Sequence, residues 1–196
     1  MKNRDNTFDV MKGIGILAMV IGHCPIPLFF EKFIFVWHVP MFFMISGYFF
    51  KKESEKVYLK KNVRHLILPY IVTSLVLIVF SLVKQLVIGK GDTMTMVIAT
   101  LVGNGTVNNP TLSRYSVGAI WFLLALFWCR LLFYFLQTRI SSRVIMGITL
   151  VTLATISTYV GTSIYLPTDI LQGISALLFF YLGYTVRIYK LLKFRK

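Results

Sequence analysis

The chain of 196 residues is 57% hydrophobic and 14% charged, against about 25% charged residues in soluble domains. Its net charge of +14 raises nucleic-acid binding as a hypothesis, but the Lys and Arg residues stand in short segments between long apolar runs. That placement is typical of the flanks of membrane helices and argues against a nucleic-acid partner. Several runs reach the roughly 20 residues that a helix needs to cross a bilayer. We therefore predict an all-α, polytopic integral membrane helix bundle in contact with membrane lipids.

Six apolar segments are predicted to span the membrane. In chain order they are residues 10–30, 33–50, 66–88, 118–137, 144–160 and 166–187. Within the polar connection 89–117, the stretch TMTMVIATLV is a candidate short interfacial helix. Neither an internal repeat nor an attached soluble domain is visible, so residues 1–196 are predicted to form a single membrane-embedded domain.

The basic residues predict the orientation of the chain. If the N-terminus is cytoplasmic and six helices span the membrane, 17 of the 21 Lys and Arg residues fall in inside segments. The outside segments then hold only Lys32, Lys84, Lys90 and Arg114. Because Lys and Arg accumulate in cytoplasmic loops, both termini are predicted to lie inside.

Two histidines lie within predicted spans, where ionisable side chains are by default candidates for function. His23 is about two thirds of the way along the first span, and His38 is six residues into the second. These antiparallel spans are joined by a short link, so a rise of 1.5 Å per residue places both imidazoles roughly 8–10 Å below the outer boundary. They could then face one cavity. The simpler alternative is that each imidazole only hydrogen-bonds a neighbouring helix.

Prolines stand close to both histidines. Pro25 and Pro27 follow His23, and Pro40 follows His38 by two residues. A proline removes a backbone donor and frees an earlier carbonyl, which in lipid requires a protein or water partner. The pattern therefore favours a site lined by irregular backbone, although a helix that ends at Pro25 explains the first pair equally well.

Small side chains near the end of the second span predict a close helix contact. The stretch ISGY places Ser46 and Gly47 at adjacent positions. Small residues let helix backbones approach each other in lipid, so another helix is expected to cross here.

The charged segment after the second span contains a candidate anion-binding pair. In LKKNVRHLILPY, Lys61 and Arg64 are three residues apart on a predicted helix, which puts both cations on one face. Paired cations at a cytoplasmic membrane face suit a phosphate or pyrophosphate group. Contact with anionic lipid headgroups explains the same residues, and so does the topology rule.

Taken together, these segments resemble the acyltransferase-3 family of integral membrane acyltransferases. The opening RDNTFDVMKGIGILAMVIGH is similar to the family's start, in which an Asp precedes an Arg or Lys that is followed, after ten residues, by a His. Here these residues are Asp9, Lys12 and His23. The stretch WHVPMFFMISGYFFKK resembles the family's second helix, with its histidine at His38.

Two later stretches extend the resemblance. KKNVRHLILPY is similar to a basic motif that usually has two arginines three residues apart before Leu-Pro-Tyr; this chain has Lys61 at the first position and keeps Arg64. Lysine lacks the planar fork that grips phosphate with two bonds, so the affinity for CoA is expected to differ. AIWFLLALFWC resembles a Trp- and Phe-rich helix that begins here at Trp121.

The resemblance implies roles for individual residues. His23 would be the leading catalytic residue, which would take a proton from an acceptor hydroxyl or accept the acyl group covalently. Lys12 lies about 16 Å from His23 along one helix, so we expect it at the donor end of the site. Asp9 would orient Lys12 or interact with the helix dipole. The remaining implied residues are Lys61 and Arg64 for acyl-CoA, and His38, Trp121 and again Asp9 for acceptor or pocket contacts.

The resemblance also implies the reaction and its setting. An acetyl or other short acyl group would pass from acyl-CoA to a hydroxyl of a cell-surface carbohydrate, in a multi-pass protein of the bacterial inner membrane. No resident cofactor is expected, and Cys24 and Cys129 have no metal-ligand spacing. Family members usually have about ten helices, so the domain is expected to be incomplete at its C-terminal side. A truncated homologue, or one completed by homo-oligomerisation, is the alternative.

Two rival functions stay open. In a proton-coupled transporter or channel-like protein, His23 and His38 would relay protons or gate a substrate. Transporters often contain inverted repeats, and this chain shows none, which lowers that hypothesis. In a truncated non-catalytic homologue, the motifs would persist without a complete site.

Overall fold

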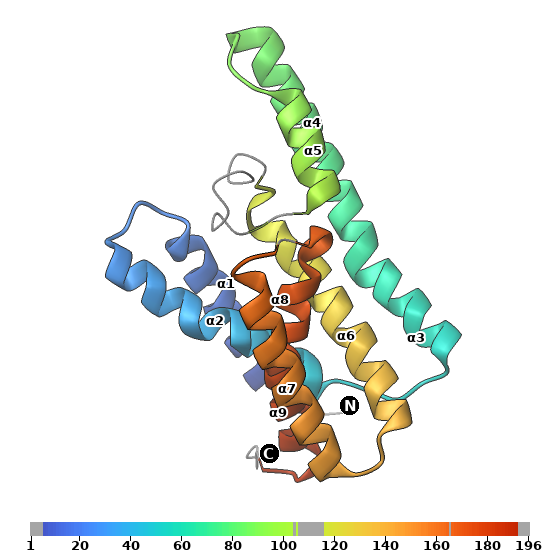
Figure 1. Ribbon diagram of the computed structural model, residues 1–196. Helices are drawn as coiled ribbons and strands as arrows, with labels where there is room; N and C mark the ends of the chain where they lie inside the picture. Colours follow the sequence, from blue (N-terminus) through green and yellow to red (C-terminus); the bar gives the residue numbers. More distant parts are fainter. Residues whose placement is uncertain (1–5, 104, 106–115, 165, 192–196) are drawn as a thin grey trace. The chain divides into compact units, whose positions relative to one another are not determined.

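The computed structural model describes residues 6–103, 105, 116–164 and 166–191, and the regular elements in these ranges are helices (Figure 1). This confirms the predicted all-α class. The contacts divide the chain into two compact units. Unit 1 consists of Met1–Lys51 and Ala176–Lys196, and unit 2 is Lys52–Ser175.

Unit 1 contains helices α1 (Thr7–Gly22), α2 (Leu28–Tyr48) and α9 (Leu177–Ile188). Helix α1 packs on α2, and α2 packs on α9. The predicted continuation of the first span to residue 30 is wrong, because α1 ends at Gly22. The link 23–27 contains two prolines, and a residue that precedes a proline disfavours the helical conformation. Residues 28–30 instead begin α2. With 16 residues, or about 24 Å, α1 is shorter than the hydrocarbon core of a bilayer.

Two glycines let α2 and α9 cross at backbone contact. A Cβ atom at Gly47 of α2 would overlap the carbonyl oxygen of Phe180 in α9. A Cβ atom at Gly183 of α9 would overlap the carbonyl oxygen of Met44 in α2. The contact is therefore reciprocal, and it confirms the close approach predicted at Ser46 and Gly47.

Unit 2 begins with one continuous helical rod. Helix α3 (Glu55–Asn62) passes through a π-helical segment, η1 (Val63–Ile67), into α4 (Leu68–Ile88). Helix α5 (Thr93–Val102) then runs back beside α4 (Figure 1). Helix α5 is the stretch TMTMVIATLV, which confirms the short helix predicted within the connection.

The rest of unit 2 is a group of packed helices. These are α6 (Trp121–Arg139), preceded by the 3-10 turn η2 (Gly118–Ile120), then α7 (Arg143–Gly161), the 3-10 turn η3 (Pro167–Asp169) and α8 (Ile170–Ser175). Helix α8 packs on both α6 and α7. The hydroxyl of Ser157 in α7 donates to the carbonyl of Leu171 in α8 at 2.7 Å. Because Gly173 has no side chain, the backbone of α8 lies directly against Ala125 and Trp128 of α6.

Four helices of the described residues are long and apolar enough to cross a membrane. They are α2, the rod Glu55–Ile88, the segment Gly118–Arg139 and α7. The sixth predicted span is broken at Ala176, where the chain passes from α8 to α9, and counting the two pieces as one span gives five. The predicted count of six is therefore not reproduced, and α1 accounts for the difference. The predicted orientation stays a prediction; several of its basic residues, including Arg114, lie outside the described residues.

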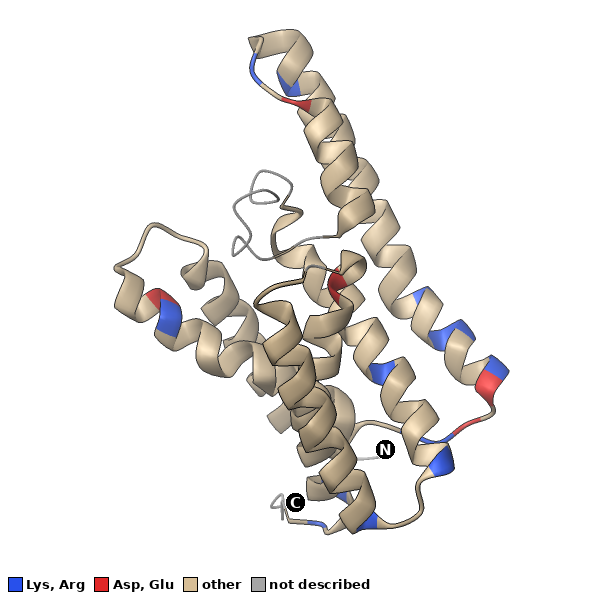
Figure 2. Ribbon diagram, viewed as in Figure 1, with Lys and Arg blue, Asp and Glu red and all other residues tan. Residues whose placement is uncertain are grey.

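The outer surface of unit 2 suits a lipid environment. Lys and Arg gather on α3 and at the connection between α6 and α7, while most of α4 carries none (Figure 2). Large apolar side chains of α4 are exposed, among them Leu75, Val79 and Phe80. Soluble proteins rarely expose contiguous apolar surface of this kind, so these faces are expected to contact lipid.

Candidate active site

His23 directly follows the last residue of α1, and its imidazole is exposed. Its Nδ1 atom lies 2.8 Å from the carbonyl oxygen of Met19, one turn earlier. A carbonyl oxygen can only accept a hydrogen bond, so Nδ1 must carry the hydrogen. In the neutral imidazole, Nε2 then holds the lone pair and is the basic nitrogen.

His38 repeats this arrangement inside α2. Its side chain is buried, and its Nδ1 atom lies 2.8 Å from the carbonyl oxygen of Ile34. The same reasoning assigns the hydrogen to Nδ1 and the lone pair to Nε2. Both histidines thus bond to their own helix through Nδ1, and the alternative in which these bonds reach a neighbouring helix is not what the structure shows.

Phe35 brings the two histidines together. The centroid of its ring lies 5.5 Å from that of His23 and 5.0 Å from that of His38. Gly22 of α1 permits this packing, because a Cβ atom there would approach the Phe35 ring to 3.2 Å. The positions of both histidines in their spans predict a similar depth, and the structure adds the Phe35 ring, which contacts both. Phe35 precedes His38 by three residues, a spacing that puts both on one face of α2.

Lys12 and Asp9 lie toward the opposite end of α1. Helix α1 runs unbroken from Thr7 to Gly22, so its geometry separates Lys12 from His23 by about 16 Å, as predicted. The Lys12 ammonium group lies 5.3 Å from the centroid of the Phe49 ring, a cation–π distance. Asp9 is exposed in the first helical turn, where a carboxylate is favoured by the helix dipole.

In unit 2 the predicted anion-binding pair has an acidic partner. The Lys61 ammonium group lies 2.6 and 2.7 Å from the two carboxylate oxygens of Glu53. Arg64 is exposed within the π-helical segment. Single-turn π segments are frequent at functional sites. Glu53 is not among the predicted site residues, although it stands eight residues before Lys61 in the same charged stretch.

Aromatic contacts hold this end of α3 against α6. The rings of Tyr58 and Tyr134 stack with centroids 4.5 Å apart. The Tyr58 hydroxyl donates to the carbonyl of Arg130 at 3.1 Å, and the Tyr134 hydroxyl donates to the carbonyl of Glu53 at 2.9 Å. The helix that carries Lys61 is therefore positioned by side chains of α6.

Trp121 is the first residue of α6 and is half-buried. A Cβ atom at Gly105 would overlap its indole ring, so the backbone at Gly105 lies directly on the indole. The predicted site residues thus divide between the units. Unit 1 holds Asp9, Lys12, His23 and His38, and unit 2 holds Lys61, Arg64 and Trp121.

Comparison with known families decides the general chemistry. Residues 5–196 match the family described as an acyltransferase domain. The chain belongs to the acyltransferase-3 family. Among the curated proteins and the solved structures, none matches it. Together with its apolar helices, this membership identifies an integral membrane protein with acyltransferase activity.

The two units of this acyltransferase-3 protein present different chemical groups. Unit 1 presents a basic imidazole nitrogen at the exposed His23, and unit 2 presents cations at Lys61 and Arg64. Among the described residues, no three His, Cys, Asp or Glu side chains lie together as metal ligands would. The chemistry that these residues support is proton transfer and anion binding.

Proposed function

We propose that this protein transfers an acetyl or other short acyl group from acyl-CoA to a hydroxyl of a cell-surface carbohydrate. The proposed setting is the bacterial inner membrane. The observation that carries the proposal is the Nδ1 hydrogen bond of His23 to the Met19 carbonyl, which leaves Nε2 as a base. An acyl transfer to a hydroxyl needs such a base.

In the proposed reaction, the acceptor hydroxyl donates its proton to Nε2 of His23 as its oxygen attacks the thioester carbonyl. A carbon–oxygen bond forms, and the carbon–sulfur bond then breaks. The departing CoA thiolate takes the proton from Nε2, which restores the neutral imidazole. In the alternative sequence, Nε2 first accepts the acyl group and the acceptor oxygen takes it in a second step.

The donor would bind through its phosphate groups. Lys61 and Arg64 offer positive charge on the helix at the start of unit 2, and both side chains are exposed. The Lys61 ammonium group already forms an ion pair with the Glu53 carboxylate, so a phosphate must compete with this carboxylate. An exposed ion pair contributes only about 0.2–1 kcal/mol, which a phosphate with two or more charges can offset.

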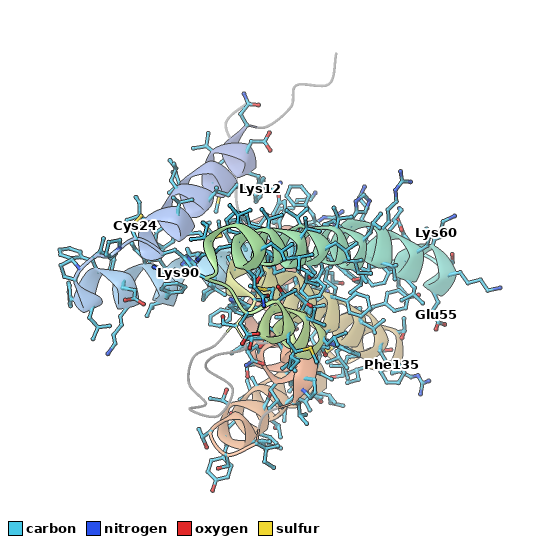
Figure 3. All side chains as sticks on the ribbon, turned by 90° about the horizontal axis from the view of Figure 1, so that it is seen from above. Lys12, Cys24, Glu55, Lys60, Lys90 and Phe135 are labelled. Carbon is cyan, nitrogen blue, oxygen red and sulfur yellow. The ribbon has the colours of Figure 1, made fainter. Side chains whose placement is uncertain are left out.

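We expect the double variant Lys61→Ala/Arg64→Ala to bind acyl-CoA at least about tenfold more weakly, because it loses two charge-assisted hydrogen bonds to phosphate. Binding of radiolabelled acetyl-CoA to the protein in nanodiscs measures this. The matched control is Lys56→Ala/Lys60→Ala, which removes the same charge from the same helix; Lys60, labelled in Figure 3, directly precedes Lys61. Equal losses in both double variants would mean that bulk charge, and not this pair, attracts the donor.

Removing the competing carboxylate should have the opposite effect. We expect Glu53→Gln to bind acetyl-CoA about two- to fivefold more tightly, which corresponds to the free energy of an exposed ion pair. The gain should shrink as salt is added, because salt screens the pair. Glu55→Gln, an exposed acid two residues away, is the control and should change the affinity less. An unchanged affinity for Glu53→Gln would show that phosphate does not compete for Lys61.

A further inference from the structure

Unit 2 contains a buried carboxylate that the proposed chemistry does not use. Asp169, the last residue of η3, has no solvent exposure, and neither of its carboxylate oxygens has a donor in hydrogen-bond geometry. The backbone of Gly105 lies near this carboxylate but does not reach that geometry. Burying a carboxylate without partners is costly, so a group of this kind calls for an explanation.

The backbone around Asp169 is held in an uncommon conformation. Thr168 and Asp169 have φ angles of 63° and 50°, in the left-handed region that residues other than glycine rarely adopt. The Trp128 indole N–H donates to the Thr168 hydroxyl at 3.0 Å, and this hydroxyl donates to the Pro167 carbonyl at 2.6 Å. These bonds hold the turn in a shape that points the carboxylate inward.

Aromatic side chains lie near this turn. The position that a Cβ atom would take at Gly103 lies 3.2 Å from the Thr168 Cα and 3.5 Å from the Tyr70 hydroxyl, so Tyr70 reaches the turn from α4. The Tyr70 hydroxyl itself is used, since it donates to the Thr100 carbonyl at 2.7 Å. Trp121 contacts Gly105, whose backbone faces Asp169.

The surroundings restrict the kind of partner that Asp169 can take. Among the described residues, no cationic side chain pairs with it, and no cluster of metal-ligand side chains includes it. A partner for this site must donate hydrogen bonds and pack against aromatic rings, and a neutral molecule with several hydroxyl groups can do both. Its hydroxyls donate to the carboxylate oxygens, and its C–H faces pack on the aromatic rings.

We propose that Asp169 anchors a carbohydrate ligand in unit 2 by accepting hydrogen bonds from two of its hydroxyl groups. The choice of a carbohydrate rests on the proposed function, in which a carbohydrate hydroxyl is the acceptor. Asp169 is fully buried, so the ligand reaches it only when a surrounding side chain moves. Binding should therefore change the environment of Trp121 or Trp128.

The chain allows a direct test, because it contains three tryptophans and two of them adjoin this site. A Trp37→Phe background leaves Trp121 and Trp128 as the fluorescent reporters. The probes are the methyl α-glycosides of glucose, galactose and mannose, titrated into the protein in nanodiscs, since glycoside detergents would themselves present sugars. We expect a saturable fluorescence change with at least one probe, weakened at least about tenfold by Asp169→Asn. Glu55→Gln, an exposed acid, should bind as the parent does.

Several results would overturn the proposal. The first is a fluorescence response that does not saturate with any probe, and the second is equal binding by Asp169→Asn. The third is a fluorescence change on adding sodium chloride, but not choline chloride, that no sugar reproduces; this would indicate a cation site. If Asp169→Asn does not fold, the unsubstituted protein serves: the bound sugar should slow carbodiimide modification of Asp169, followed by peptide mass spectrometry. Unchanged modification would also overturn it. None of these measurements involves acyl-CoA, so their failure leaves the proposal for His23 standing, and loss of acyl transfer does not alter the sugar binding that they detect.

Discussion

His23→Ala should lower acyl transfer at least about 100-fold while the protein still inserts and folds, because a general base contributes about 10²–10⁴ to such a rate. The side chain is exposed at the end of α1, so its loss opens no core cavity. The measurement is release of the CoA thiol from acetyl-CoA by the protein in nanodiscs, with and without a carbohydrate acceptor.

His23→Asn separates the chemistry of this residue from its packing. The asparagine amide can still donate to the Met19 carbonyl as Nδ1 does, but it has no basic nitrogen in place of Nε2. We expect it to be as inactive as His23→Ala. The control is Cys24→Ala, which changes the exposed neighbouring residue and should keep the parent rate.

Activity in His23→Asn near that of the parent would contradict a role for His23 as base and would leave it a structural residue. A different result would favour the transporter hypothesis, namely proton flux into vesicles that is altered by His23→Ala and independent of acyl-CoA. Absence of any thiol release by the folded parent would support the non-catalytic homologue instead.

The largest effect on stability is expected at the crossing of α2 and α9. Gly47→Ala and Gly183→Ala should each destabilise unit 1 by about 3 kcal/mol, the upper end of the usual cost of overpacking. The added Cβ atoms would overlap the carbonyl oxygens of Phe180 and Met44. Backbone oxygens in packed helices cannot rotate away as the end of a flexible side chain can, so the helices must separate. Thermal unfolding in detergent, followed by tryptophan fluorescence and circular dichroism, measures the change.

The same unit supplies a matched control. Gly13 lies in α1, and a Cβ atom there would have no heavy atom within 4 Å. Gly13→Ala should therefore raise stability by about 0.5–1 kcal/mol, since alanine loses less conformational entropy in a helix than glycine does. If Gly47→Ala and Gly183→Ala unfold at the temperature of Gly13→Ala, the close crossing of α2 and α9 does not exist in the membrane.

The separation of α2 and α9 should also affect the end of α2. Arg187 of α9 donates to the carbonyl oxygen of Tyr48, the last residue of α2, at 3.4 Å, and to that of Phe50, two residues beyond it. Carbonyls at a helix C-terminus lack intrahelical partners, and a guanidinium group satisfies them. Loss of the glycine crossing is expected to remove this contact as well.

Much of the fold could be predicted from local sequence. The all-α membrane class, the extents of α5, α6 and α7 and the family follow from the length of apolar runs, turn residues and short ordered motifs. The early end of α1 was also predictable, because Pro25 and Pro27 already indicated a helix end as an alternative. The small residues Ser46 and Gly47 correctly indicated a close helix contact. They could not identify the partner, because α9 lies about 130 residues further along the chain.

The candidate site shows where local sequence stops being sufficient. His23 stands out because an ionisable residue is costly in lipid. Lys61 and Arg64 stand out because their spacing puts two cations on one face of a helix. The sequence by itself thus determined a helical membrane protein of the acyltransferase-3 family and named its candidate base and anion-binding residues. The tertiary structure decided that the Phe35 ring contacts both histidines, that Glu53 pairs with Lys61 and that the buried Asp169 carboxylate has no donor in hydrogen-bond geometry. These features depend on which side chains meet after the helices pack, as the contact of Phe35 in α2 with His23 at the end of α1 illustrates.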